Sequence, residues 1–212
     1  MKKLFAVCII GLALGTTSVF ADHPSGWGVG AVFGGPSFYG WGILNYDNDH
    51  PQSYYRYYGS YFSLPFGVSL KMPFLPIYWK LGLNFGSNTY ISNFGLSVTG
   101  DYYFIDKVLA EGAKLHWFLG AGGFFNFDSF TLKKSWSGLR EDVSWANFEL
   151  GARGVIGLSW QPIPLIEVFL NGVVALGIGF DTPFKSGGYE ESGRFIFPTG
   201  GVGGELGIRF WF

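Results

Sequence analysis

Apolar and polar residues alternate with a period of two in eight segments of this chain. In the clearest segment, every even-numbered residue from Phe62 to Met72 is apolar, and the residues between them are small or polar apart from Pro65. Successive side chains of a β-strand point to opposite faces, so this alternation predicts strands with one apolar face. The predicted strands span residues 27–34, 61–72, 77–85, 94–104, 115–127, 148–160, 166–180 and 202–212.

The number and spacing of these segments predict a closed barrel that crosses a membrane. A strand of about nine residues or more crosses a bilayer when tilted, and single-chain outer-membrane barrels have an even number of strands. The predicted connections are short at 73–76, 105–113 and 161–164, long at 36–58, 128–144 and 181–195, and unexpectedly short at 87–92. Because short turns of such barrels face the periplasm, we expect an all-β, eight-stranded, antiparallel up-and-down transmembrane β-barrel with both termini in the periplasm.

Composition argues against the other classes of protein. Of the 212 residues, 48% are hydrophobic, 20% aromatic and only 14% charged, which is unusual for a water-soluble domain. After the N-terminal segment, no run of about 18 apolar residues predicts a membrane-spanning helix. A soluble β-sandwich would place its aromatic rings along strand centres, whereas these tryptophans are expected near the membrane edges. Trp27, Trp79, Trp117, Trp160 and Trp211 fall near periplasmic strand ends, and Trp41, Trp136 and Trp145 fall in or beside outer loops.

The first 21 residues have the features of a secretory signal. Lys2 and Lys3 precede an apolar stretch over 4–14, and a small residue, Ala21, stands where a signal peptidase cleaves. The alternative is a membrane anchor, for which the apolar stretch is short. We therefore expect a signal peptide at 1–21 and a barrel domain at 22–212.

Cleavage after Ala21 would leave a mature chain without cysteine and with a small net charge. The only cysteine, Cys8, would be lost, so the mature chain would contain no disulfide or thiol. It would have 12 basic and 15 acidic side chains, a net charge of about −3. This charge predicts no nucleic-acid partner, because such partners require a clustered basic face.

Taken with the strand pattern, the C-terminal sequence Phe210-Trp211-Phe212 resembles that of small eight-stranded outer-membrane barrels such as the OmpA transmembrane domain, OmpX and OmpW. The start of the mature chain, His23 to Gly30, also resembles small envelope barrels of spirochaetes. The first resemblance implies outer-membrane lipid as surroundings. It also implies that Phe210 and Phe212 form an assembly signal read by the barrel-insertion machinery.

The inward positions of the predicted strands carry balanced charges. An eight-stranded barrel is barely wide enough for its own side chains, so charges of opposite sign are expected to pair across the lumen and plug it. The alternative is a gated ion or proton path, in which His116 could act as a switch. We expect Arg153 and Glu205 in a middle layer, and Lys71, Lys80, Asp101, Glu167 and Arg209 in a periplasmic layer with His116. The expected lumen network comprises Lys71, Lys80, Asp101, His116, Glu149, Arg153, Glu167, Glu205 and Arg209.

The outer loops are the expected recognition surface, since exposed loops on a rigid scaffold often carry binding residues. An aromatic cluster in the first long loop could bind a host or extracellular ligand, or could instead form a membrane-edge belt. The candidate surface residues are Tyr54, Tyr55, Tyr57, Tyr58, Lys133 and Lys134.

Catalysis and metal binding have weaker support. Asp47, Asp49, His50 and Ser53 resemble the residue types used by barrels that modify lipid A, but a catalytic relay requires a spatial arrangement that spacing does not give. His23, His50 and His116 belong to a tail, a loop and the lumen, so they are not expected to share a metal ion. We therefore expect no enzyme, cofactor or metal. The expected function is a structural or adhesin-like surface role, with a narrow channel for small or apolar solutes and a lipid A-modifying enzyme as alternatives.

Overall fold

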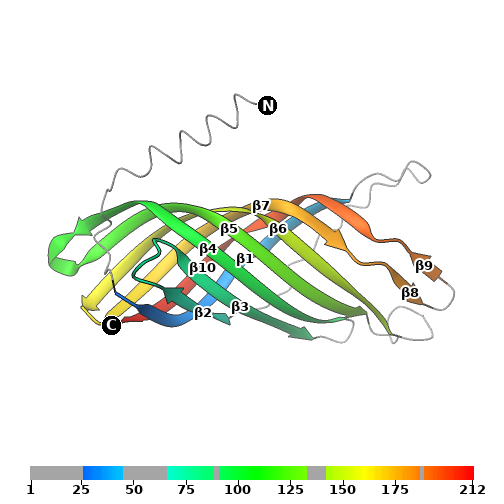
Figure 1. The fold of residues 1–212 in the computed structure, drawn as a ribbon, viewed down its shortest axis with the longest axis horizontal. Coiled ribbons are helices and arrows are strands. Elements are labelled where there is room, and N and C mark those ends of the chain that lie inside the picture. The colour runs from blue at the N-terminus through cyan, green and yellow to red at the C-terminus, as the bar shows by residue number, and fades with distance from the viewer. Residues whose placement is uncertain (1–25, 45–65, 88–90, 133–141, 187–188) are drawn as a thin grey trace, which may run out of the picture.

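The computed structural model describes residues 26–44, 66–87, 91–132, 142–186 and 189–212, and within them eight strands form a closed antiparallel barrel (Figure 1). Each barrel strand pairs with the barrel strands that precede and follow it in the sequence, and the last, β10 (Arg194–Trp211), pairs with the first, β1 (Gly28–Leu44), to close the ring. No helix in the described part of the chain is long and apolar enough to cross a membrane. The barrel strands are β1 (Gly28–Leu44), β2 (Phe66–Lys71), β3 (Tyr78–Ser87), β4 (Ile91–Ala110), β5 (Leu115–Leu132), β6 (Val143–Ile163), β7 (Ile166–Asp181) and β10 (Arg194–Trp211). The fold class predicted from the alternation is confirmed.

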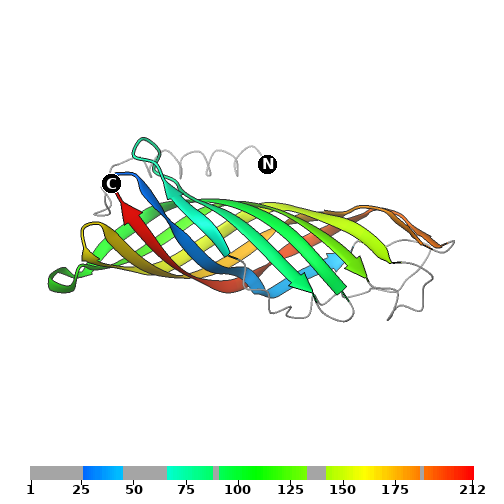
Figure 2. The same ribbon diagram turned by 90° about the horizontal axis from the view of Figure 1, so that it is seen from below.

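The strands are strongly staggered around the barrel. Following the paired residues once around the ring from Val32 leads back to β1 at Leu44, twelve positions further along the strand. Closing a barrel with such a stagger requires the strands to tilt steeply against its axis, as Figure 2 shows. Residues that pair directly across several strands therefore lie at different depths.

The two ends of the barrel differ. Backbone hydrogen bonds between Trp27 and Phe212 hold the start of β1 beside the C-terminus, at the end that also carries the turn η1 (Glu111–Ala113). Lys114 closes this turn in the left-handed conformation, with a φ of 49°. At the opposite end, β8 (Phe184–Ser186) and β9 (Tyr189–Glu191) form a two-stranded ribbon beyond the barrel (Figure 1).

Several predicted connections are wrong in their bounds, because the strands extend into them. The structure continues β4 to Ala110, through most of the connection expected at 105–113, and continues β5 to Leu132. A register shift between Tyr103 and Ile105 explains the first error, because it interrupts the alternation and turns both Tyr103 and Asp106 inward. The loop expected at 181–195 contains β8 and β9.

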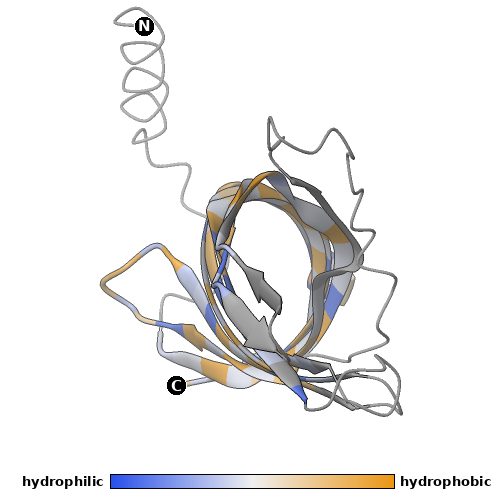
Figure 3. Cartoon of the chain, turned by 90° about the vertical axis from the view of Figure 1, so that its right-hand side faces the viewer, coloured by the Kyte–Doolittle hydropathy of each residue, from blue (hydrophilic) through white to orange (hydrophobic). Residues whose placement is uncertain are grey.

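The outward side chains form an apolar surface around the whole ring. Leu150, Leu176 and Leu206 are each more than half exposed, and their inward neighbours along the strands are polar, small or buried. Figure 3 views this ring along the barrel. Trp27 and Trp160 lie on the outer surface with exposures of 44% and 48%.

The expectation that the ring of Trp211 lies at the membrane edge is wrong. It is only 3% exposed and lies inside the barrel, because its neighbours Phe210 and Phe212 take the outward positions.

Candidate functional site: the polar interior

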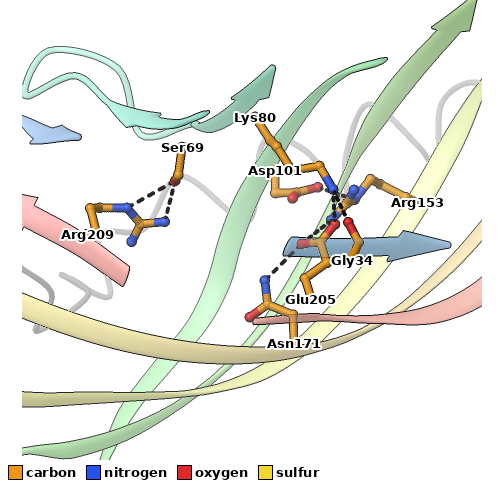
Figure 4. A network of polar contacts seen from close by, with 8 residues as sticks. All are labelled: Gly34, Ser69, Lys80, Asp101, Arg153, Asn171, Glu205 and Arg209. Atoms are coloured by element: carbon orange, nitrogen blue, oxygen red, sulfur yellow. Dashed lines mark hydrogen bonds and ion pairs between the residues drawn. The ribbon is translucent and has the colours of Figure 1, made fainter. Parts of the chain in front are cut away.

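Four charged side chains meet in the middle of the barrel (Figure 4). Lys80 Nζ lies 2.5 Å from Glu205 Oε1, and Arg153 Nη2 donates to both oxygens of the same carboxylate at 3.1 and 3.2 Å. Arg153 Nε lies 2.9 Å from Asp101 Oδ1. The four residues are between 3% and 8% exposed, so two positive and two negative groups neutralise one another out of contact with bulk water.

Neutral groups complete this central layer. Asn171 Nδ2 donates to Glu205 Oε2 at 3.1 Å, and Lys80 Nζ donates to the carbonyl oxygen of Gly34 at 3.3 Å (Figure 4). Glu205 therefore accepts hydrogen bonds from Lys80, Arg153 and Asn171. Such charge-assisted bonds are stronger than bonds between neutral groups.

A glycine on the intervening strand allows the Asp101–Arg153 contact. In the register of the sheet, Gly122 of β5 lies between Asp101 of β4 and Arg153 of β6. A Cβ at Gly122 would lie 2.0 Å from the carbonyl oxygen of Gly100 and 2.5 Å from Asp101 Oδ1. The missing side chain thus makes room for a contact that spans two strands.

A second ion pair lies closer to the C-terminal end. Arg209 Nη1 donates to Glu167 Oε2 at 2.6 Å, and its other nitrogens donate to Ser69 Oγ at 2.9 and 3.2 Å. Glu167 also accepts from Ser159 Oγ and from the indole Nε1 of Trp211, both at 2.9 Å. The inward position of Trp211 gives this buried carboxylate a further donor.

Aromatic rings fill the space beside this pair. Tyr78 and Tyr103 stack with ring centroids 4.1 Å apart, and Phe118 stacks on Tyr103 at 4.2 Å. The guanidinium of Arg209 lies 4.8 Å from the centroid of Tyr78 and 4.6 Å from that of Phe169, within the range of cation–π attraction. The barrel between the central layer and the C-terminal end is thus packed with rings and ion pairs.

The remaining candidates of the predicted network lie outside these two layers. His116 Nδ1 is 3.6 Å from Asp106 Oδ1, and Lys71 Nζ donates to the backbone oxygens of Met72 and Leu75 at the barrel end. Glu149 lies on the other side of the central layer, where it accepts from Thr199 Oγ1 at 2.6 Å and Asn126 Nδ2 at 3.2 Å.

The predicted division into layers is wrong for Lys80 and Asp101. Lys80 shares a row of paired residues with Arg209, three strands away, yet it bonds Glu205. With strands about 4.8 Å apart and tilted by about 45°, the depth in the barrel changes by roughly 10 Å along this row. The four-residue step along β10 from Arg209 to Glu205 changes the depth by about the same amount, so Lys80 lies level with Glu205. Counting residues from strand ends ignores this tilt.

Sequence reasoning also missed interior residues that bind the charges. Ser69 and Asn171 stood on the predicted inward rows, but nothing in the sequence marked them as partners of Arg209 and Glu205. Asp106 was missed because it was placed in a connection, and its inward position follows from the register shift before it.

Several predicted sites lie outside the described residues. These are the signal peptide, the catalytic candidates His50 and Ser53, and the surface candidates Tyr54, Tyr55, Tyr57, Tyr58, Lys133 and Lys134. Of the expected assembly signal, Phe210 is 44% exposed and Phe212 is 79% exposed, both on the outside. Among the described residues, no three His, Cys, Asp or Glu side chains gather closely enough to form a metal site.

Comparison with other proteins identifies the class of fold. No protein-family model matches the chain, and neither does any curated protein. The solved structure of a major outer membrane protein from Thermus thermophilus matches with a TM-score of 0.51 and 14% identity, over 89% of this chain and 100% of that chain. This match supports the eight-stranded outer-membrane barrel fold that the sequence resemblance implied.

Two other solved structures are similar at lower scores. The N-terminal β-barrel domain of Pseudomonas aeruginosa OprF matches with a TM-score of 0.44 and 13% identity, over 88% of this chain and 98% of that chain. Ail, the attachment invasion locus protein of Yersinia pestis, matches with a TM-score of 0.41 and 11% identity, over 87% of this chain and 98% of that chain.

Proposed function

We propose that this chain is an integral barrel of the bacterial outer membrane whose lumen is closed and whose role lies at its outer surface. The observation that carries the proposal is the central layer, in which Lys80, Asp101, Arg153 and Glu205 pair across the interior. Arg153 and Glu205 are each 3% exposed. A permeation path commonly carries an excess of one charge, whereas this layer is balanced and its groups bond one another.

The outward face supports a position in the membrane. Large apolar side chains half exposed on every strand of the ring would be unfavourable in water and favourable against lipid tails. We propose that residues 1–21 direct export and are removed, that the insertion machinery reads Phe210 and Phe212, and that both termini face the periplasm.

A conductance measurement tests the closed lumen. Protein purified folded from outer membranes is inserted into planar bilayers, and folding is checked by its heat-modifiable mobility on a gel. We expect silence from the unaltered protein. In Arg153→Ala the bridge between Asp101 and Glu205 is lost, so openings are expected. Steady openings of the unaltered protein would contradict the closed lumen and favour a narrow channel.

The surface role is supported by the ribbon of β8 and β9, which extends beyond the barrel at the end opposite the C-terminus (Figure 1). We propose that this ribbon and the predicted loop residues Tyr54, Tyr55, Tyr57, Tyr58, Lys133 and Lys134 form an adhesin-like surface.

Cells that display the unaltered chain are compared with cells in which residues 182–193, or separately 45–60, are replaced by a Gly/Ser linker. We expect the replacements to reduce attachment to epithelial cell layers without changing the heat-modifiable mobility. Equal attachment of all three, at equal surface amounts, would refute the adhesin-like role.

A further inference from the structure

The turn that connects β2 to β3 is entirely apolar. Residues 72–77 have no polar side chain, and the turn stands away from the wall of the barrel near the C-terminus (teal in Figure 2). Phe74 in this turn is 69% exposed, and its ring meets the exposed ring of Trp27 edge-on at a centroid distance of 6.0 Å. Turns that face water are rich in polar residues, so these exposed side chains indicate other surroundings.

The turn continues the apolar outer face of the barrel. Phe66 and Val68 of β2 point outward and are about half exposed. The same alternating row runs on through Leu70 and Met72 to Phe74. The surface that meets lipid along β2 is thus continuous with the surface of the turn.

The turn lies short of the end of the barrel. β3 begins at Tyr78, which pairs with Asp101, whereas β4 continues well past Asp101 toward the same end. The outer face of that extension includes the exposed side chains of Phe104 and Leu109. Turn η1, with its exposed Glu111, lies further out (Figure 1). The apolar surface of the barrel therefore extends beyond the base of the turn.

Several polar groups of the turn's backbone are absent or already paired. Pro73 and Pro76 have no N–H, and Leu75 N donates to the oxygen of Met72 at 3.2 Å. The buried Lys71 Nζ donates to the oxygens of Met72 and Leu75 at 2.8 and 2.7 Å. Irregular backbone is costly in lipid because its polar groups lose water, and pairing within the turn lowers this cost.

The turn between β6 and β7 has a similar composition on the opposite side of the ring. Residues 161–165 include Pro162 and Pro164, and the side chains of Ile163 and Leu165 are exposed. In the ring, β4 and β5 separate the two turns on one side, and β1 and β10 separate them on the other. A protein bound at 72–77 would leave the opposite turn uncovered, whereas lipid surrounds the whole ring. The two turns together favour lipid as the partner.

We propose that the turn 72–77 is a lipid-binding wedge in the periplasmic leaflet of the membrane. Phe74 and Trp27 lie together at the boundary between acyl chains and headgroups, where aromatic rings are favoured. The partner of this surface is phospholipid. The wedge requires the membrane position proposed above, and it extends lipid contact from the strands to a connecting turn.

The accessibility of a spin label tests the wedge. Phe74→Cys carries a nitroxide in a chain that also has Cys8→Ser, and the folded protein is placed in phosphatidylcholine vesicles. Oxygen concentrates in lipid and a nickel chelate in water, so the ratio of their relaxation effects reports the surroundings of the label. Leu150→Cys on the outer face and Glu111→Cys in turn η1 are the lipid and water references. We expect the ratio at 74 to lie near that at 150 and about threefold or more above that at 111.

A matched pair of lysine variants tests the donor within the turn. Lys71→Met removes the hydrogen bonds to the oxygens of Met72 and Leu75, which then require water. It is expected to lower the ratio at 74 by about threefold. Lys107→Met, at an exposed position of β4, should change the ratio by less than about 1.5-fold.

The references separate the outcomes, and heat-modifiable mobility checks that each variant is folded. A water-like ratio at 74 beside a lipid-like ratio at 150 would overturn the wedge and leave the membrane position intact. Water-like ratios at both positions would overturn the membrane position as well. Low accessibility of 74 to both reagents, with dipolar coupling between labels, would assign the turn to contact with a second copy and overturn the wedge. An unchanged ratio in Lys71→Met would overturn the role of this lysine, and if that variant does not fold, the ratio at 74 in the unaltered background still decides.

Discussion

Glu205 accepts hydrogen bonds from three side chains of the central layer, so neutralising it tests how much that layer stabilises the barrel. Glu205→Gln keeps nearly the same shape and removes the charge. Lys80 and Arg153 would then face Asp101 as the remaining carboxylate of the layer. Removing one partner of a buried ion pair costs about 3–5 kcal/mol, because the other charge stays buried and uncompensated. We expect a loss near the lower end of this range, since the amide oxygen can still accept one bond.

The assay is denaturant unfolding of the protein in phospholipid vesicles, followed by tryptophan fluorescence and by gel mobility. The free energy of unfolding is obtained by linear extrapolation to zero denaturant. Glu111→Gln, a neutralisation in the exposed turn, is the matched control and should change it by less than about 0.5 kcal/mol.

A double variant separates charge pairing from simple damage to packing. Lys80→Met combined with Glu205→Gln leaves Arg153 paired with Asp101 and restores neutrality. We expect the double variant to lose at least about 2 kcal/mol less than the two single losses added together, as interacting groups do. A loss under about 1 kcal/mol in Glu205→Gln, or additive losses, would refute the view that pairing holds this layer together.

Four further predictions concern other parts of the chain. Gly122→Ala should destabilise the barrel by about 1–3 kcal/mol through its clash with the Gly100 carbonyl, while Gly123→Ala, whose nearest contact is at 3.5 Å, should be tolerated in the same unfolding assay. Leu150→Arg on the outer face should cost about 2–4 kcal/mol in vesicles if that face meets lipid, and a negligible change would contradict the membrane position. Trp211→Phe should cost about 1.5–3 kcal/mol by removing the donor to Glu167, and full stability would show that this bond contributes nothing. Mass spectrometry of the protein from outer membranes should find Asp22 as the first residue, and an intact N-terminus would refute the signal peptide.

The local pattern of the sequence determined the strands and their faces. Alternation depends only on the period of two along an extended chain, so it placed Leu150 outside and Arg153 inside without knowledge of the neighbouring strands. The same reasoning predicted the number of strands and the closed antiparallel order. It was weakest where alternation is interrupted, as at Tyr103 to Ile105, where a register shift extends β4 and brings Asp106 inside.

Which interior side chains meet was decided only by the tertiary structure. The sequence listed Lys80, Asp101, Arg153 and Glu205 as inward residues, but their meeting depends on the stagger of the closed ring, which no single strand encodes. A tilt of about 45° shifts the depth of each strand relative to its neighbour and so brings Lys80 level with Glu205 rather than with Arg209. The sequence thus determined which residues enter the lumen, and the geometry of barrel closure determined their partners.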